Sequence, residues 1–200
     1  MKAEVGLLTR NIKMMGDSSS DNEDQNRRYG SHLLITGRGS NGNWGHVGYS
    51  EFTKCGQPQI LGRYCIHFHM MGDVPDSFSR GNAVHDSFAR LTTVHGVHYL
   101  TVEHNVGYKI HGHNIFVEDG VETHNTIRYN LIISTRASTN MLQTDTSCAS
   151  IWVTNPANDV YGNVVGGSDF YGIWYEIKEH PDGPSGSSHV CPIGNPMGQV

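Results

Sequence analysis

The chain has 200 residues, a net charge of −5 and an apolar fraction of 36%, with 24 glycines and 13 histidines. This length suits one domain with a real core, and the acidic balance argues against a nucleic-acid backbone as a partner. No run of about 18 apolar residues occurs, so no membrane span is predicted, and the first residues lack the apolar core of a signal peptide.

A polar stretch near the start of the chain marks off a leading segment. Residues 16–28 are polar throughout and predict an exposed loop. We therefore separate a leading segment, residues 1–30, from a main body, residues 31–200. The last residues, 192–200, show no pattern of a closing element, so we expect the body to be truncated at that end.

The tetrad Ile66-His67-Phe68-His69 alternates apolar and histidine side chains. In a strand, His67 and His69 then share one face while Ile66 and Phe68 share the other. Two imidazoles at this spacing, with Asp73 close behind in sequence, are candidates for a divalent-metal or glycan site. The alternative is that both histidines only satisfy polar groups of neighbouring chain segments.

Short strand-like segments separated by Gly, Asn and Asp succeed one another through the main body. We predict stacked coils in which Val84, Val102, Ile127 and Val160 form an inward ladder, at steps of 18, 25 and 33 residues. One corner of these coils would carry the stacked polar side chains of Ser87, Asn105, Asn130 and Asn163.

A second column of strands is expected between the corners. It comprises residues 92–95, 115–118, 151–154 and 171–175. The whole pattern predicts an all-β fold, namely a parallel β-helix. A β-sandwich is the competing fold, but few two-residue hairpin turns occur.

Further titratable residues extend the candidate site. If the coils align in this way, His85 lies one coil after the His67 strand, and His95 is nearby; a histidine beside a carboxylate can do acid–base work. Glu118 and Asp119 form the best carboxylate pair for glycosidic chemistry. Adjacent residues of a regular strand point to opposite faces, however, so a third carboxylate would be needed.

Aromatic residues and cysteines complete the candidates. Trp152, Trp174 and Tyr175 could stack on sugar rings, with Asn155 beside them, although aromatics in strands more often belong to a core. The four cysteines have no metal-binding spacing, and whether they pair is left open; they are Cys55, Cys65, Cys148 and Cys191.

Several motifs together resemble a known family. They are residues 62–73 (GRYCIHFHMMGD), 118–120 (EDG), 152–156 (WVTNP) and 172–175 (GIWY). They are similar to the fibrocystin-L group, which shares a G8 domain and a β-helix with the cell-migration-inducing hyaluronan-binding protein and the transmembrane hyaluronidase. One departure is Cys65, where the family pattern usually has proline.

The resemblance implies an extracellular or cell-surface protein whose fold is a right-handed parallel β-helix of the pectin-lyase type. It also marks residues 1–30 as the tail of a preceding G8-type region. It implies a module that binds matrix glycans such as hyaluronan, or matrix and cell-surface proteins. The alternative that it leaves open is a hyaluronan-degrading polysaccharide hydrolase, with catalytic candidates among the same histidines and carboxylates.

Overall fold

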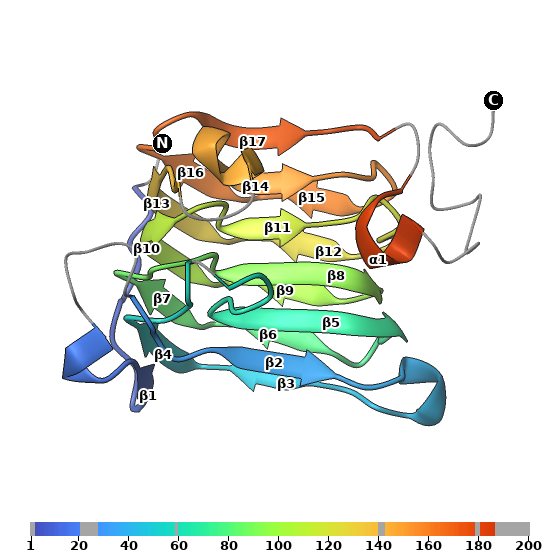
Figure 1. The fold of residues 1–200 in the computed structure, drawn as a ribbon, viewed down its shortest axis with the longest axis horizontal. Coiled ribbons are helices and arrows are strands. Elements are labelled where there is room, and N and C mark those ends of the chain that lie inside the picture. Colours follow the sequence, from blue (N-terminus) through green and yellow to red (C-terminus); the bar gives the residue numbers. More distant parts are fainter. Residues whose placement is uncertain (1–2, 21–27, 59, 140–142, 179–180, 187–200) are drawn as a thin grey trace.

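The computed structural model describes residues 3–20, 28–58, 60–139, 143–178 and 181–186. Their strands form three parallel sheets of six, six and five strands. In each sheet neighbouring strands are three apart in chain order, as expected when every coil adds one strand to each sheet. The stack runs from β2 at the bottom of Figure 1 to β17 at the top. The chain is therefore a parallel β-helix, and the sandwich alternative is excluded.

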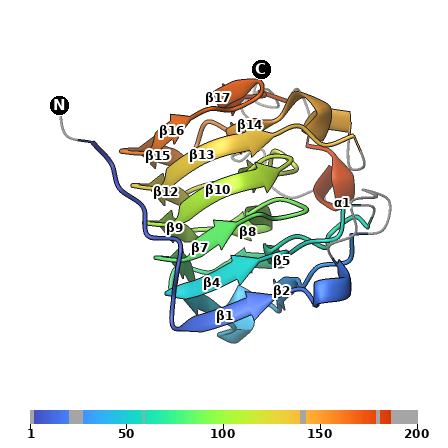
Figure 2. The same ribbon diagram turned by 90° about the vertical axis from the view of Figure 1, so that its left-hand side faces the viewer.

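Each sheet is one side of the helix. The first, turned towards the viewer in Figure 2, contains β1 (Ile12–Met15), β4 (Ser50–Thr53), β7 (Ala83–His85), β10 (Val106–His111), β13 (Leu131–Arg136) and β16 (Val164–Gly166). The second contains β2 (Leu33–Thr36), β5 (Ile66–Asp73), β8 (Thr92–His98), β11 (Ile115–Val117), β14 (Ala149–Val153) and β17 (Tyr171–Tyr175). The third contains β3 (His46–Gly48), β6 (Phe78–Arg80), β9 (Thr101–Glu103), β12 (Thr126–Arg128) and β15 (Asp159–Tyr161).

Helical structure in the described part of the chain is limited to short turns. Three are 3-10 helices, at Ser18–Ser20, Gly39–Asn41 and Gln143–Ser147, and the fourth is α1 (Gly183–Gly186). Among the described residues, none of these helices has the length and apolarity to cross a membrane.

The core lies inside the coils and is built from inward ladders. In the second sheet Ile66 pairs with Thr92, and Ile115 and Ile151 continue that column. Phe68 pairs with Val94, the next inward position along the strands. All of these side chains are buried. The second column of strands predicted from the sequence, residues 92–95 to 171–175, is confirmed by this register.

The aliphatic ladder of the third sheet was predicted only in part. Val102, Ile127 and Val160 do stack on one another. The residue below Val102 is Ser79, however, and Val84 pairs instead with Phe52 and Gly107 in the first sheet. The prediction failed here because the inward residue of this coil is a serine, which an apolar pattern does not mark.

The same error displaced one residue of the polar corner. Its members are Asn82, Asn105, Asn130 and Asn163, and Ser87 is not among them. The true steps along this corner are 23, 25 and 33 residues. The Oδ1 atoms of Asn105, Asn130 and Asn163 each accept both the backbone and the amide N–H of the asparagine in the preceding coil, at 2.9–3.1 Å.

One disulfide pins the lower coils. Cys55 follows β4 and bonds to Cys65, ten residues later and directly before β5. The loop between them therefore has fixed ends. Cys148 is a buried free thiol, and burial raises its pKa to about 11. Cys191 lies outside the described residues.

Candidate functional site

A groove lies on the outer face of the second sheet and has a volume of about 530 Å³. We call it the histidine groove. Strands β5, β8 and β11 form its floor. Residues 61–64 form one wall, and residues 176–178 and 182–184 form another. The residues that line it include Gly62, Tyr64, His67, His69, His95, Phe116, Glu118, Asp119, Glu176, Lys178 and Asp182.

His67 and His69 project from β5 to the outer face, as the alternating pattern predicted. His67 is 2% exposed, and its Nδ1 donates to the carbonyl of Gly62 at 2.9 Å. The other ring nitrogen, Nε2, is buried and has no hydrogen-bond partner among the described residues. Burial lowers the pKa of His67 to about 3, so the ring is neutral.

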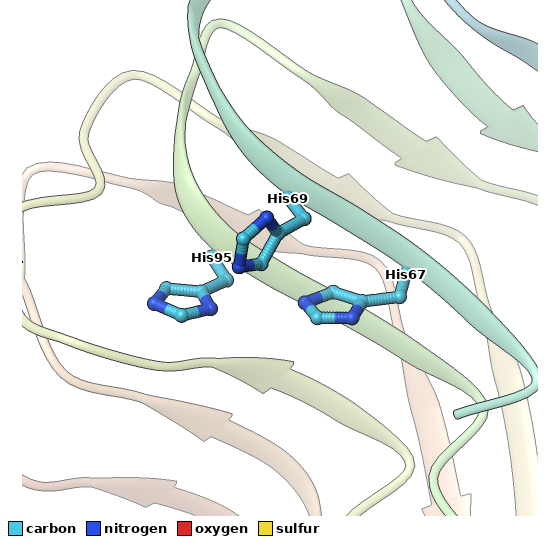
Figure 3. A group of neighbouring side chains, drawn as sticks. All are labelled: His67, His69 and His95. Atoms are coloured by element: carbon cyan, nitrogen blue, oxygen red, sulfur yellow. The ribbon is translucent and has the colours of Figure 1, made fainter. Parts of the chain in front are cut away.

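His95 completes a cluster of three imidazoles, shown in Figure 3. It is the residue that pairs with His69 across β5 and β8. Its ring lies parallel to that of His67, with centroids 5.9 Å apart, and edge-on to that of His69 at 4.8 Å. One nitrogen from each ring lies within 4.8 Å of the other two.

Two carboxylates hold His95 in place. Its Nε2 lies 2.8 Å from the Asp119 carboxylate, and its Nδ1 lies 3.6 Å from that of Glu118. Burial alone would lower the pKa of His95, but the Asp119 bond and the Glu118 charge outweigh it and raise the pKa. Burial is also the main cause that raises the pKa of Glu118.

Glu118 and Asp119 therefore act on one ring, although opposite faces were expected for adjacent residues. The reason is that β11 ends at Val117, so the chain has left the strand before Asp119. Glu122 fixes this turn, since its carboxylate accepts the backbone N–H groups of Asp119 and Gly120 at about 3 Å. Burial raises the pKa of Glu122 to about 7.

Asp73 does not join the site, contrary to the interpretation that grouped it with His67 and His69. The pairing of β5 with β8 shifts register between His69 and Gly72, and Met70 has a positive φ of 52°. Such a bulge re-aims the strand that follows it. Asp73 is exposed and lines a separate hollow with Gly39.

His85 is also elsewhere, so the prediction that it lies one coil after His67 is wrong. It belongs to β7 in the first sheet, where its ring contacts Glu51 at 3.2 Å and Asp86 at 2.8 Å. The misplaced Val84 step caused this error, and His95 occupies the position that His85 was expected to take.

Of the four residues predicted to bind glycan, two are buried. Trp152 packs against Phe116 and Ala149, and Asn155 donates to the carbonyl of Gly120 at 2.8 Å. Trp174 is 39% exposed and Tyr175 is 44% exposed, both on β17. Trp174 is the better placed of these two, because it continues the outward column of Phe116 and Trp152, whereas Tyr175 continues the inward column of Val153.

Sequence reasoning missed several residues of the groove. Tyr64 lies in the GRYC motif, but nothing in its spacing assigned it to a site. Arg90 is fully buried against the Phe116 ring, and it donates to Asp145 at 2.8 Å and to the Tyr64 hydroxyl at 3.2 Å. Lys178 is the described cation of the groove wall and pairs with Asp182 at 2.6 Å. No local pattern marks Arg90 or Lys178.

Comparison with known proteins places the chain in a family. The CEMIP beta-helix family model matches residues 28–198. The human protein Fibrocystin-L is 35% identical over 99% of this chain. The human Cell surface hyaluronidase CEMIP2 is 33% identical over 92%, and the human Cell migration-inducing and hyaluronan-binding protein is 30% identical over 97%.

The chain covers only part of each relative, namely 5% of Fibrocystin-L, 16% of CEMIP2 and 17% of the third protein. The motif resemblance to the fibrocystin-L group is confirmed by these matches, and the fold that it implied is the fold observed. The chain belongs to the CEMIP beta-helix family and is similar along nearly its whole length to Fibrocystin-L.

Proposed function

We propose that the chain is a glycan-binding module of an extracellular or cell-surface protein, with the histidine groove as its binding site. The observation that carries this proposal is the groove itself, whose volume of about 530 Å³ lies in the range of small-ligand sites. Two relatives support the choice of glycan, since their names describe a cell surface hyaluronidase and a hyaluronan-binding protein.

The exposed Trp174 adds a platform for a sugar ring. It stacks on Tyr171 with centroids 4.3 Å apart, and both rings are more than a third exposed. Glu176 follows Trp174 two residues later and lines the groove, so this aromatic pair lies roughly 7 Å along the chain from the groove lining. Aromatic faces are the usual contacts for the apolar faces of sugars.

Calorimetric titration of the chain with hyaluronan oligosaccharides, which measures their binding affinity, tests the proposal. Trp174→Ala should weaken binding at least fivefold, while Trp44→Ala is the matched control because Trp44 is 60% exposed but lies away from the groove. Equal affinity of the two variants, or no binding by the unmodified chain, would refute the proposed site. Selective binding of a protein partner instead would replace the glycan by that partner.

A second candidate function is cleavage of the bound polysaccharide. The observation in its favour is Glu118, a partly buried carboxyl with a raised pKa beside the His95–Asp119 pair. A carboxylic acid of this kind can protonate a glycosidic oxygen. The test is the chain length of high-molecular-weight hyaluronan after incubation. Catalysis is supported if the unmodified chain shortens hyaluronan and Glu118→Gln does not. It is rejected if the length of hyaluronan stays constant across pH 5–8 and with added divalent metals.

A further inference from the structure

The histidine groove contains a nitrogen that is placed to bind something. His67 is almost completely buried, and its Nδ1–H is used by the Gly62 carbonyl. A neutral imidazole protonated at Nδ1 carries a lone pair at Nε2. That atom is shielded from solvent and has no hydrogen-bond partner among the described residues. A buried acceptor of this kind costs free energy unless a ligand uses it.

His95 offers a second lone pair to the same space. Its Nε2 is held by Asp119 at 2.8 Å, so in the singly protonated ring the proton lies there and Nδ1 is the acceptor. A carboxylate that orients a histidine from its far nitrogen is the usual support of a metal-binding imidazole. Glu122 in turn holds the backbone of Asp119, so this support is itself fixed.

His69 supplies the third imidazole of the cluster. Its ring is edge-on to both neighbours, with centroids 5.0 Å from His67 and 4.8 Å from His95. The three donor nitrogens lie within 4.8 Å of one another, and Figure 3 shows the rings converging from β5 and β8. Donors around one tetrahedral ion lie about 3.4 Å apart, so small rotations of the rings bring them to one ion.

We propose that His67, His69 and His95 bind one divalent transition-metal ion, with zinc the best match to three imidazole nitrogens, and that Asp119 positions His95 for it. Three protein nitrogens with a fourth position open to a ligand are the pattern of catalytic rather than structural zinc. The Glu118 carboxylate lies 3.6 Å from Nδ1 of His95, one of the three proposed ligand atoms. The inference rests on the proposed function and deepens it, because it places the ion in the glycan groove.

The negative charge of the groove lining indicates what a bound cation would do there. Four carboxylates line it, those of Glu118, Asp119, Glu176 and Asp182, against the single described cation Lys178. A polysaccharide that carries uronate groups is an anion and would be repelled by this lining. A divalent ion on neutral imidazoles adds two positive charges at the floor and supplies a contact for a uronate carboxylate.

Zinc titration of the chain, purified without a histidine tag, tests the site directly. We expect one equivalent of Zn²⁺ to bind, and His69→Gln to weaken it at least tenfold. His69 is only partly buried, so its replacement should leave the fold intact, which melting in EDTA checks. His124→Gln is the matched control, because His124 is exposed and lies outside the groove. Equal zinc affinity of both variants would overturn the proposal.

Two further measurements separate this site from other zinc binding. Asp119→Asn should lower zinc affinity 10- to 100-fold, the usual effect of losing the partner of a ligating histidine. X-ray absorption should show nitrogen or oxygen neighbours at about 2.0–2.1 Å. A sulfur shell at about 2.3 Å would place the ion on a cysteine instead and would contradict the assignment.

Hyaluronan binding with and without zinc distinguishes failure of this inference from failure of the proposed function. Glycan binding that persists in EDTA, without zinc uptake by the chain, would refute the metal site and leave the glycan site standing. Zinc uptake that depends on His69, without any glycan binding, would establish the metal site and remove the proposed ligand. Glycan binding that requires zinc supports both.

Discussion

Two columns of polar side chains run along this β-helix, and they differ in whether their polar groups have hydrogen-bond partners in neighbouring coils. At the asparagine corner, each amide bonds to the same group one coil away, so Asn105 and Asn130 are buried and fully used. In the histidine groove His67 stacks between two different residues, Leu34 and Thr93, and its Nε2 has no described partner. Asparagines repeated in successive coils can hydrogen-bond to one another, whereas a column of different residues can leave a polar group available for a ligand.

The buried Arg90–Asp145 ion pair next to the groove is also fully paired, and breaking it should cause the largest loss of stability. Arg90 and Asp145 are both fully buried, and Arg90 also lies 3.8 Å from the centre of the Phe116 ring. We expect Arg90→Met to lower the free energy of unfolding by about 3–5 kcal/mol, because Asp145 would remain as an unpaired buried charge. Urea denaturation measures this.

A double variant provides the control for this ion pair. Arg90→Met combined with Asp145→Leu removes both charges and should be more stable than Arg90→Met alone. A double variant less stable than the single one would show that packing around Arg90, rather than its charge pairing, dominates the loss.

The asparagine corner should come next in size. Asn130→Ala removes the acceptor of the Asn105 backbone N–H and the donor to the Val102 carbonyl, both buried. Each buried polar group left unpaired costs about 1–3 kcal/mol, so we expect a total of about 3 kcal/mol. Chemical denaturation gives the value, and Tyr129→Ala, at a half-exposed neighbour, is the control. A loss under about 1 kcal/mol would contradict the satisfied-ladder interpretation.

The corner also shows what the sequence could predict. Asparagines at the ends of apolar triplets marked three of its four members and the parallel stacking of the coils. Asn82 escaped because its triplet, Phe78-Ser79-Arg80, has no aliphatic centre. His67 and His69 were found by strand alternation alone. His95 was also a candidate, but its pairing with His69 was not predicted because the wrong Val84 step shifted the register of the coils. The Arg90–Asp145 pair was missed because its two residues are 55 positions apart in the sequence.

Reduction of the disulfide should act on the groove more than on the corner. Cys55 and Cys65 close the loop that carries Gly62 and Tyr64, the wall residues next to His67. Opening a loop of this length costs about 2–3 kcal/mol in the chain-entropy model. Hydrogen exchange of a Cys55→Ser/Cys65→Ser variant should speed up around residues 60–67 first. Equal acceleration at Asn105 and Asn130 would contradict a local effect.

The smallest change in the free energy of unfolding is expected on replacing His67 in metal-free protein. This replacement contrasts most strongly with that of Asn130. His67→Leu removes the unpaired Nε2 and loses one hydrogen bond to Gly62, whose carbonyl lies in an exposed loop. The relief of a buried unsatisfied atom offsets the lost bond, so we expect a change under about 1 kcal/mol in EDTA. In zinc at about a hundredfold excess over its dissociation constant, the unmodified chain should gain about 2.7 kcal/mol and His67→Leu almost nothing. Thermal and urea unfolding in the two buffers measure both quantities. A large loss already in EDTA would mean that His67 supports the fold as Asn130 does, and the groove would then be one more satisfied ladder.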